Sequence, residues 1–245
     1  MRKFKKFAYI LIALLLISIM LVSSILFLKD KKQDKEEQQV FDDLIDIVEQ
    51  DNTDNLDENN NIDYSTLFDM NSDMVAWIKI DGTSINYPVM QTRDRPNYYL
   101  RKNFYKQYSY YGTPYIQENC DIKGSDNLII YGHHINNSKM FGVLEKYKSK
   151  TFFDEHKIID FITKENIYKY KVIYAFKTSA KNGFKYYEYF NFEDKSKFET
   201  FKNKCEGLTF YNTEEEVNYG DKFITLSTCD YSQENGRMVV IAKKI

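Results

Sequence analysis

An uncharged, apolar run near the start of the chain, at positions 7–28, restricts what this end of the protein can form. Basic residues at positions 2, 3, 5 and 6 precede it. A helix needs roughly 20 apolar residues to cross a bilayer, whereas the apolar core of a cleaved signal peptide has roughly 7–15. We therefore expect an uncleaved transmembrane anchor. The alternative is a signal peptide that uses the small residues near 22–24 as its cleavage site.

The charges on the two sides of this run predict its orientation in the membrane. The tail before the run has six residues and carries four basic side chains, and short basic segments favour the cytoplasmic side. Lysines at positions 29, 31, 32 and 35 follow the run and weaken this asymmetry. The sequence predicts a single-pass protein of the cell membrane whose functional domain lies outside the cytoplasm.

The segment 29–63 has the composition of a polar connection. It is rich in charged residues, Asn and Asp, and four apolar side chains within it recur at helical spacing, at positions 41, 44, 45 and 48. Two interpretations remain open, a stalk with one short amphipathic helix over 40–48 and a wholly disordered linker. We expect three parts in the chain: a tail and anchor at 1–28, a polar stalk at 29–63 and a folded domain at 64–245.

Short β-type runs separated by turn signals recur from residue 64 to the end, which predicts a mainly β domain. We expect strands at 75–80, 85–91, 113–117, 127–131, 158–162, 166–176, 222–228 and 238–243. Asp81-Gly82 gives a hairpin signal between the first two. Helical spacing appears at 64–70, 140–147 and 194–205, and in the last segment Phe198, Phe201 and Cys205 share one face.

Composition and residue spacing exclude several classes of function. A net charge of −2 gives no basic excess for phosphate binding, so nucleic acid is not an expected partner. The three histidines and three cysteines show no paired spacing typical of zinc sites, and there is no phosphate-binding or dinucleotide-binding loop. We expect no metal and no other cofactor. Three cysteines are too few for a disulfide scaffold, and their odd number leaves at least one free thiol.

Cys229 lies where the chain leaves the predicted strand 222–228. A lone cysteine is usually a small buried apolar residue, so its companions decide the interpretation. The predicted strand 127–131 leads into Gly132-His133, and Arg237 follows the cysteine by eight residues. A cation favours the thiolate, an imidazole can protonate a leaving amine, and a guanidinium can donate to a developing oxyanion. The three side chains together indicate cysteine-based acyl chemistry.

The motifs around these residues resemble the sortase family. They are Thr225-Leu226-Ser227-Thr228-Cys229, Arg237, and Tyr131-Gly132-His133. Further segments follow the order that class B members show: Trp77-Ile78-Lys79-Ile80, Ile85-Asn86-Tyr87-Pro88-Val89-Met90-Gln91, Tyr99-Leu100 and Ser138-Lys139-Met140-Phe141. The predicted helix at 194–205 resembles one that class B members insert before the cysteine strand. The resemblance covers residues 64–245.

This resemblance implies a closed or nearly closed eight-stranded β-barrel with peripheral helices. It implies a catalytic trio of Cys229, His133 and Arg237. It also implies substrate contacts in and near the same motifs, from Asn97, Leu100, Tyr131, Ser227 and Thr228. Class B members usually have Asp-Asn before the Tyr-Leu pair, whereas this chain has an additional residue there. This departure affects the assignment of Asn97 as a substrate contact. Cys120 and Cys205 belong to no family motif and are expected to be buried and unpaired.

The adjacent histidines 133 and 134 pose a choice. Neighbouring residues on a strand point to opposite faces, so the two cannot both be catalytic. The family motif places the working histidine directly after glycine, which is His133. We expect His134 to have a supporting or structural role.

By resemblance, the chain is a membrane-anchored cysteine transpeptidase. Cys229 would attack the Thr carbonyl of a five-residue sorting signal near the C-terminus of a secreted protein, and His133 would protonate the departing amine. A peptidoglycan amine, deprotonated by His133, would then attack the thioacyl-enzyme. The expected partners are therefore secreted proteins with a sorting signal, a peptidoglycan precursor or stem peptide, and the membrane. Arg237 would donate to the oxyanion or orient the carbonyl, and the sequence leaves both open.

Two other functions would use a similar set of residues or a similar fold. Papain-like wall peptidases also use cysteine and histidine, but their cysteine begins a helix and precedes the histidine, whereas here the order is reversed. An anchored β-domain that acts as an adhesin or as a scaffold for wall assembly would not need the three residues together. Labelling with a thiol-reactive probe distinguishes this binding module from an enzyme. A binding module predicts that labelling causes no loss of activity and that Cys229 does not react preferentially.

Overall fold

The computed structural model describes residues 2–54 and 63–245, and the chain forms two compact units, Met1–Asp46 and Ile47–Ile245. Helix α1 (Arg2–Asp54) accounts for the described part of the first unit and continues into the second. Large apolar side chains between Tyr9 and Leu28 are exposed on this helix. Such a surface is suited to hydrocarbon rather than water, and the helix is long and apolar enough to cross a membrane.

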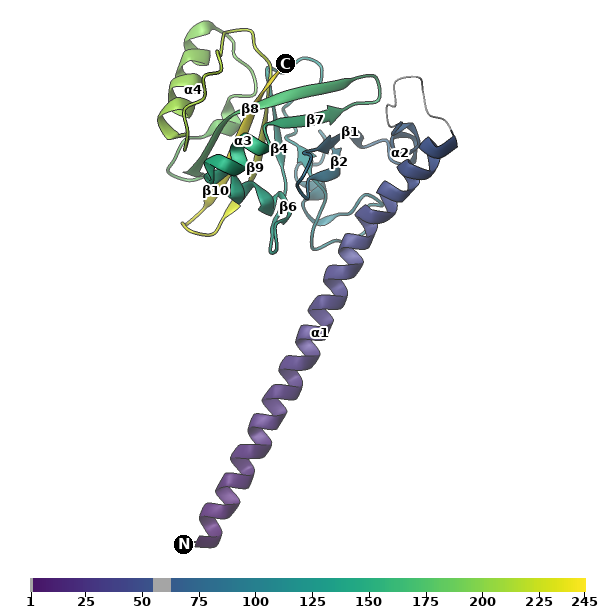
Figure 1. The fold of residues 1–245 in the computed structure, drawn as a ribbon, viewed down its shortest axis with the longest axis vertical. Helices are drawn as coiled ribbons and strands as arrows, with labels where there is room; N and C mark the ends of the chain where they lie inside the picture. The colour runs from purple at the N-terminus through teal and green to yellow at the C-terminus, as the bar shows by residue number, and fades with distance from the viewer. Residues whose placement is uncertain (1, 55–62) are drawn as a thin grey trace. The chain divides into compact units, whose positions relative to one another are not determined.

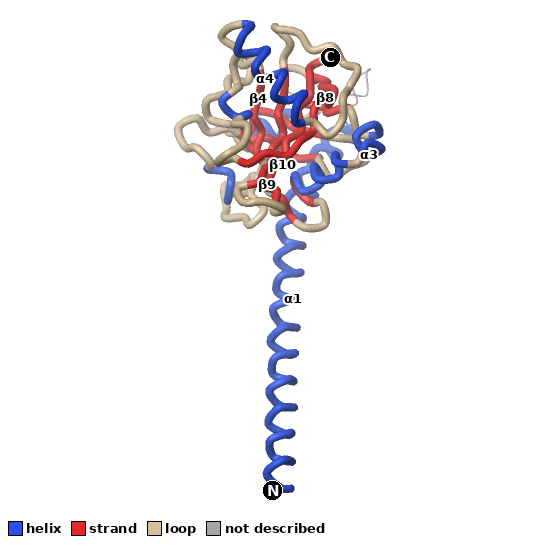
Figure 2. The backbone as a smooth tube through the Cα atoms, turned by 90° about the vertical axis from the view of Figure 1, so that its left-hand side faces the viewer, coloured by secondary structure: helices blue, strands red, loops and turns tan. Residues whose placement is uncertain are grey.

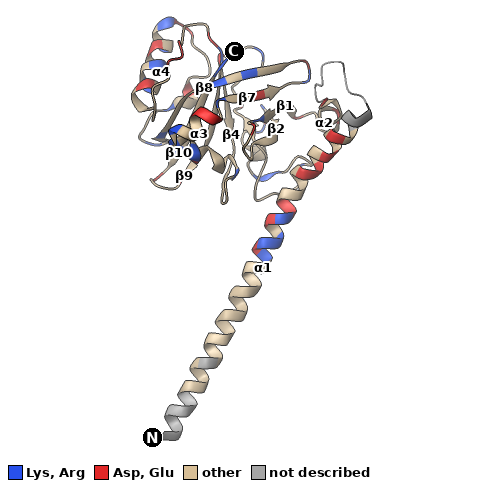
Figure 3. Cartoon of the chain, in the orientation of Figure 1, with Lys and Arg blue, Asp and Glu red and all other residues tan. Residues whose placement is uncertain are grey.

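Charge on α1 changes sharply along its length. Figure 3 shows a long uncharged stretch, then a group of basic residues, and then mainly acidic ones. The helix includes the predicted 40–48 segment and extends beyond both of its ends. Side-chain hydrogen bonds one turn apart support this polar part, because Gln38 donates to Asp42 and Gln39 to Asp43, at 3.1 and 2.7 Å. The part of the predicted stalk at 55–62 lies outside the described residues.

Eight strands of the second unit close into a barrel (Figure 1). They are β1 (Met74–Lys79), β2 (Asn86–Met90), β3 (Tyr115–Ile116), β4 (Asn127–Tyr131), β7 (Ile158–Ile162), β8 (Ile167–Ser179), β9 (Phe223–Asp230) and β10 (Gly236–Lys244). Their order around the barrel is β1-β2-β3-β4-β9-β10-β8-β7, and β7 pairs with β1 to close it. The predicted mainly β fold and the eight-stranded barrel are confirmed.

Helices and two short strands surround the barrel. They are α2 (Ser65–Met70), η1 (Tyr98–Arg101), β5 (His134–Ile135), β6 (Lys139–Met140), η2 (Phe141–Lys148), α3 (Lys150–Glu155), η3 (Tyr186–Glu188) and α4 (Lys195–Leu208), where η denotes a 3₁₀ helix. Figure 2 shows the strands in the interior of this unit and the helices α3 and α4 outside them.

The pairing of β4 with β9 positions the site. These two strands run parallel, and Tyr131 lies opposite Ser227 at the end of their ladder. Parallel neighbours need a long crossover, and here the chain between them contains β5 to β8 and α4. Residues far apart in sequence are therefore brought to the same end of the barrel.

Helix α4 packs against β8 and against the first residue of β9. Asp194 caps its first turn by accepting a backbone N–H bond, as its position before the helix favours. Phe198, Phe201 and Cys205 are buried on one face, as the spacing predicts. The rings of both phenylalanines pack near Phe223 of β9, with centroids 6.4 and 6.0 Å away. All residues of β9 except Cys229 are buried, so both faces of this strand are covered.

The structure differs from the sequence expectation between residues 134 and 148. The segment predicted as a helix at 140–147 is the 3₁₀ helix η2, since over two turns the spacing of apolar residues does not separate periods of 3.0 and 3.6. The hairpin β5–β6 was not predicted. Its turn places Asn137 and Ser138 at positive φ, 59° and 61°, without the glycine that usually signals such a turn.

Candidate active site

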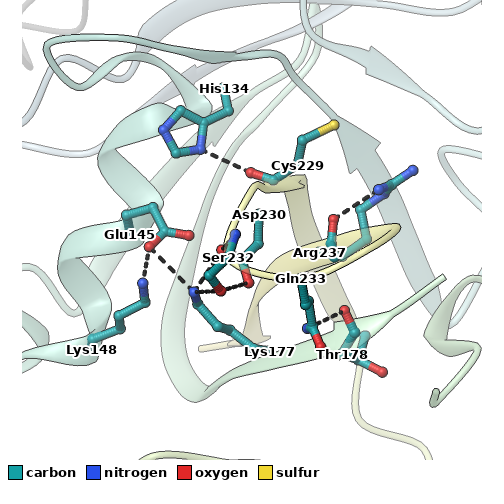
Figure 4. A network of polar contacts seen from close by, with 11 residues as sticks. His134, Glu145, Lys148, Lys177, Thr178, Cys229, Asp230, Ser232, Gln233 and Arg237 are labelled. Atoms are coloured by element: carbon teal, nitrogen blue, oxygen red, sulfur yellow. Dashed lines mark hydrogen bonds and ion pairs between the residues drawn. The ribbon is translucent and has the colours of Figure 1, made fainter.

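The two strands β9 and β10 place Cys229 and Arg237 directly opposite each other in an antiparallel ladder. Side chains that face each other across such a ladder lie on the same side of the sheet. Cys229 is half-buried and lies one residue before the end of β9. Figure 4 shows the two side chains on these adjacent strands. The thiol therefore has a guanidinium as its neighbour across the ladder.

The charges of Cys229 and Arg237 act on the same two phenols. Burial raises the pKa of Tyr186 to about 12, and there Arg237 acts to lower it and Cys229 to raise it. Burial also raises the pKa of Tyr115, with opposite contributions from the same two residues. These tyrosines therefore stay protonated at neutral pH, and their hydroxyls can donate hydrogen bonds.

Arg237 keeps donors free for another partner. Its Nη1 donates to the carbonyl of Gly236 at 2.8 Å. A guanidinium carries five N–H donors in a planar fork, so this bond fixes the group and leaves further donors to bind a carbonyl oxygen.

His133 follows the end of β4, two residues after Tyr131. The last pair of the β4–β9 ladder is Tyr131 with Ser227, so His133 and Cys229 each follow that pair by two residues. The His133 Nε2 lies 2.8 Å from the carbonyl oxygen of Leu100, which can only accept, so Nε2 carries the hydrogen. The Nδ1 of the neutral ring is then left as the acceptor.

The environment of His133 favours the neutral ring. Burial lowers its pKa from the ordinary value of 6.5; the bond to Leu100 acts in the opposite direction, and the charge of Arg101 lowers it again. The net result is a lowered pKa, so the ring is mainly neutral at pH 7. The ring can then take up a proton and release it in the physiological pH range, as a general acid and base must.

Two glycines permit the close approaches around His133. A Cβ on Gly132 would lie 2.5 Å from the ring of Phe141, so only glycine lets η2 pack against the residue before the histidine. Gly112 has φ +61°, and a Cβ there would lie 2.6 Å from the Leu100 oxygen that binds His133. At both positions a side chain would collide with a neighbouring residue, so the chain needs glycine there.

Phenols and amides form a connected polar wall near this end of the barrel. The Tyr131 hydroxyl donates to Gln117 Oε1 at 2.6 Å, and the Tyr115 hydroxyl donates to Asn97 Oδ1 at 2.8 Å. The rings of Tyr115 and Tyr131 lie 5.6 Å apart. Asn97 is exposed and has φ 59°, a conformation that Asn tolerates better than most residues. The structure therefore brings Asn97 and Tyr131, two predicted contact residues, onto the same wall.

The remaining predicted contact residues differ in their placement. Leu100 is exposed in η1. Ser227 is buried, and its hydroxyl lies 2.5 Å from the hydroxyl of Tyr186. Thr228 pairs with Met238 and, by the alternation of strand side chains, points to the face opposite Cys229. Its buried hydroxyl has no hydrogen-bond partner among the described residues. The structure does not bring this side chain to the thiol.

The second histidine has a separate role in the geometry. The Nδ1 of His134 donates to the backbone carbonyl of Cys229 at 2.8 Å. Figure 4 shows the thiol pointing away from the His134 ring. The two histidines therefore contact different groups, His133 the Leu100 carbonyl and His134 the backbone of the cysteine.

A partly buried ion pair directly after the cysteine was not predicted (Figure 4). Lys177 of β8 donates to Asp230 Oδ1 at 2.6 Å, and Ser232 donates to Asp230 Oδ2 at 2.7 Å. Burial acts to raise the pKa of Asp230, but the bonds from Lys177 and Ser232 outweigh it and hold the pKa below its ordinary value. The lysine lies 53 residues from the aspartate, so no local pattern in the sequence reveals the pair.

The other two thiols are buried and unpaired, as expected. Burial raises the pKa of Cys120 to about 11 and that of Cys205 well above the ordinary value. Neither thiol is reactive at neutral pH, which leaves Cys229 as the accessible one.

Comparison with known proteins decides the family. The Sortase domain family matches residues 78–245, more than half of the chain. The chain belongs to the sortase family. It is 35% identical over 185 residues to sortase B of Staphylococcus aureus, covering 74% of each chain. It is 31% identical over 179 residues to sortase B of Listeria monocytogenes, covering 72% of this chain and 71% of the relative.

Solved structures agree with this membership. A Staphylococcus aureus sortase B–substrate complex superposes with a TM-score of 0.72 and 30% identity, covering 89% of this chain and 98% of that one. Sortase B from Clostridium perfringens gives 0.68 and 28%, covering 74% and 98%. Sortases are cysteine transpeptidases that act at the cell surface, and this sortase is of the class B type.

Proposed function

We propose that this sortase cleaves a C-terminal sorting signal of secreted proteins at a Thr carbonyl. The Cys229 thiolate attacks that carbon, and the tetrahedral intermediate collapses as the C–N bond breaks. His133, which has taken the thiol proton at Nδ1 and is now an imidazolium, gives that proton to the departing amine. The product of this half-reaction is a thioester between the substrate and Cys229. Arg237 donates to the carbonyl oxygen as it becomes an oxyanion.

The second half-reaction transfers the acyl group. An amine of a peptidoglycan precursor or stem peptide gives a proton to the neutral His133 as it attacks the thioester. The new amide bond forms, the C–S bond breaks, and the electron pair returns to sulfur as thiolate. Atoms and charge balance without a cofactor, since one amide bond replaces another.

The observation that carries this proposal is the direct pairing of Cys229 with Arg237 in the β9–β10 ladder. His133 reaches the same end of the barrel on the other side of β9, through the β4–β9 register. The nucleophile thus has a fixed guanidinium on one neighbouring strand and an imidazole beyond the end of the other. An adhesin or scaffold has no need of this arrangement.

We infer that the polar wall beside the thiol binds the sorting signal. Asn97, Leu100 and Tyr131 offer an amide, an apolar side chain and a phenol to it. Ser227 contributes through its bond to Tyr186, since its hydroxyl is buried. Thr228 contributes through its backbone, because its side chain points to the other face.

We propose the arrangement in the cell from the charge and apolarity of α1. Residues 1–28 form a cytoplasmic tail and single-pass anchor in the cell membrane, 29–63 a polar stalk and 64–245 the catalytic domain outside the cytoplasm. The exposed apolar side chains from Tyr9 to Leu28 support the anchor. This placement brings the site to the side on which secreted proteins and peptidoglycan are found.

Mass spectrometry of purified protein with a panel of fluorogenic pentapeptides tests this function. We expect a peptide with Thr before the scissile bond to be cleaved, and a product ligated to the amine when a suitable peptidoglycan amine is present. The thioester should be detectable on the tryptic peptide that contains Cys229.

Substitution controls identify the nucleophile. Cys229→Ala should abolish cleavage and keep the fold, because removal of one half-buried thiol leaves little cavity. Cys120→Ala and Cys205→Ala should keep cleavage. Turnover by Cys229→Ala, or cleavage without any transfer to an amine, contradicts the proposed function.

A further inference from the structure

The backbone of Cys229 lies where two parallel strands separate. The β4–β9 ladder ends with Tyr131 opposite Ser227, and the N–H of Gly132 then donates to the carbonyl of Ser227 at 3.1 Å. In a parallel pair these bonds are evenly spaced and come from every second residue. The next donor in the series would be the backbone N–H of His134, and the next acceptor the carbonyl of Cys229.

The side chain of His134 takes that place. Its Nδ1 donates to the Cys229 carbonyl at 2.8 Å, so the imidazole spans the space between the separating strands. A carbonyl left without a partner at this point would lose a hydrogen bond and gain freedom to rotate its peptide plane. The ring thus replaces one step of the ladder and lets β4 turn away from β9.

The ring itself is held on several sides. His134 is the first residue of β5 and pairs with Met140 of β6. A Cβ on Gly142 would lie 3.3 Å from His134 Cδ2, which shows how closely η2 approaches. The ring of Tyr231, just beyond β9, lies 5.2 Å away. A donor fixed in this way restricts the peptide plane on the carboxyl side of the cysteine.

The next residue is fixed independently. Asp230 has a side chain that is 3% exposed, and it is bonded to Lys177 and Ser232. The cysteine therefore lies directly before a buried carboxylate, and its own carbonyl is bound by an imidazole. The orientation of the Cys229 side chain depends on these two restraints on the peptide that joins them.

We propose that His134 is a positioning residue for the nucleophile. Its Nδ1–H fixes the Cys229 carbonyl, and this directs the thiol toward the side on which Arg237 lies rather than toward the His134 ring. This inference rests on the proposed function of Cys229. His134 takes no part in proton transfer, and its effect on the reaction passes through the cysteine backbone.

Three substitutions separate the hydrogen bond from packing. His134→Asn keeps a side-chain N–H donor close to the position of Nδ1, whereas His134→Phe keeps a ring against Tyr231 and Gly142 but has no donor. His134→Ala removes both. We expect the Ala and Phe variants of the full chain in detergent to acylate about tenfold more slowly with unchanged KM, as misplacement of a reacting group does, and Asn to be close to the parent.

Two measurements need no substrate and keep this inference apart from the proposed function. ¹⁵N NMR of the labelled His134 ring should show hydrogen on Nδ1. Alkylation of the thiol by iodoacetamide across pH should have a different profile in Ala and Phe than in the parent, with Asn unchanged. Circular dichroism of each variant confirms that it is folded.

Each of these measurements can overturn the positioning role of His134. A parent that acylates no peptide removes the proposed function, while the alkylation profiles still test the positioning role. The inference is overturned if the His134 ring carries its hydrogen only on Nε2 and none on Nδ1. A His134→Phe variant that behaves like the parent also overturns it, since packing of a ring would then suffice. Identical alkylation profiles for the parent and the Ala, Phe and Asn variants overturn it as well.

Discussion

The thiol of Cys229 has its two proposed partners on different neighbours of β9, Arg237 on β10 and His133 beyond β4. Each partner can therefore be altered without moving the other. The partners also differ in what they must supply, since Arg237 must donate directed hydrogen bonds and His133 must carry a proton.

Arg237→Lys tests whether direction or charge matters. Lysine keeps the positive charge but replaces a planar fork of donors with a compact, strongly hydrated ammonium on a flexible stem. We expect the rate of acylation to fall by roughly 10²–10³-fold, the effect of losing an oxyanion donor, with little change in apparent substrate binding. Single-turnover kinetics with a fluorogenic peptide measure both.

Acylation by Arg237→Lys at nearly the parent rate would contradict this role. Arg237 would then act as a general positive charge, and the oxyanion donors would be backbone N–H groups near Cys229. Cys229→Ala is the inactive control for the same assay.

The protonation of His133 can be followed directly. Its pKa is lowered mainly by burial, and also by the charge of Arg101, so NMR titration of the ring should give a midpoint below 6.5. Arg101→Gln removes the charge and should raise that midpoint.

A rise in the His133 midpoint also predicts a change in catalysis. The profile of acylation against pH should be bell-shaped and report macroscopic values of the Cys–His pair. In the Arg101→Gln variant, the limb of this pH profile that reports His133 should move in the same direction as the midpoint measured by NMR. An unchanged midpoint in that variant would show that Arg101 does not act on the ring.

Sequence motifs indicated the reactive side chains but not the groups that hold them. Cys229, His133 and Arg237 lie in short local patterns, so the strand and loop context of each could be recognised. Leu100 was expected to contact substrate, yet its carbonyl also binds His133, 33 residues away. The bond from His134 to the cysteine backbone joins residues 95 apart. Such contacts depend on the closed barrel, and no local spacing encodes them.

At the scale of elements, the ion pair of Lys177 and Asp230 ties the end of β9 to β8. The pKa of Asp230 is lowered in the folded chain. The ion pair therefore stabilises the fold fully at pH values above 3.8, the ordinary pKa of an aspartate. This stabilisation is lost as the pH falls through the lowered pKa of the folded chain. We expect Asp230→Asn to reduce the free energy of unfolding at pH 7 by about 1.5–3 kcal/mol, the range for hydrogen bonds to charged groups.

Urea unfolding at several pH values tests this dependence. The difference between Asp230→Asn and the parent should be largest at neutral pH and shrink below pH 3.8. Asp94→Asn is a matched control, because Asp94 pairs with Arg95 at 3.6 Å but its side chain is 80% exposed. Exposed pairs of this kind contribute about 0–1 kcal/mol. A difference for Asp230→Asn that does not change with pH would contradict the assignment.

The strands were predicted well because alternation and turn residues mark them. Predicted segments 127–131 and 158–162 coincide with β4 and β7. β9 extends two residues beyond its predicted end, to Asp230, because the ladder with β10 continues past the cysteine. The two-residue strands β5 and β6 are too short for any periodicity, and they exist through the tight turn that joins them.

At the scale of the whole molecule, the proposed anchor and catalytic domain should be separable in function. A chain beginning at residue 63 lacks the apolar stretch but keeps all eight strands of the barrel. We expect it to remain in the soluble fraction and to cleave a soluble peptide at a rate similar to that of the full chain. Fractionation and the peptide assay measure these two properties.

The same truncation should fail where the membrane matters. In cells, anchoring of a secreted substrate should fall when residues 1–62 are replaced by a cleavable signal peptide, because the enzyme is then released from the surface. Equal anchoring by the released and full-length forms would contradict the proposed role of α1.

The parallel contact between β4 and β9 also has a consequence for the order of folding. The two strands are neighbours in the barrel, yet the chain between them forms β7, β8 and α4. Contacts between such distant segments form late, since a large loop must close first. While the chain is incomplete, Cys229 lacks its neighbours from β4 and β10 and remains an ordinary thiol. The proposed activity of this thiol therefore appears only when the last strand is in place, together with the finished fold.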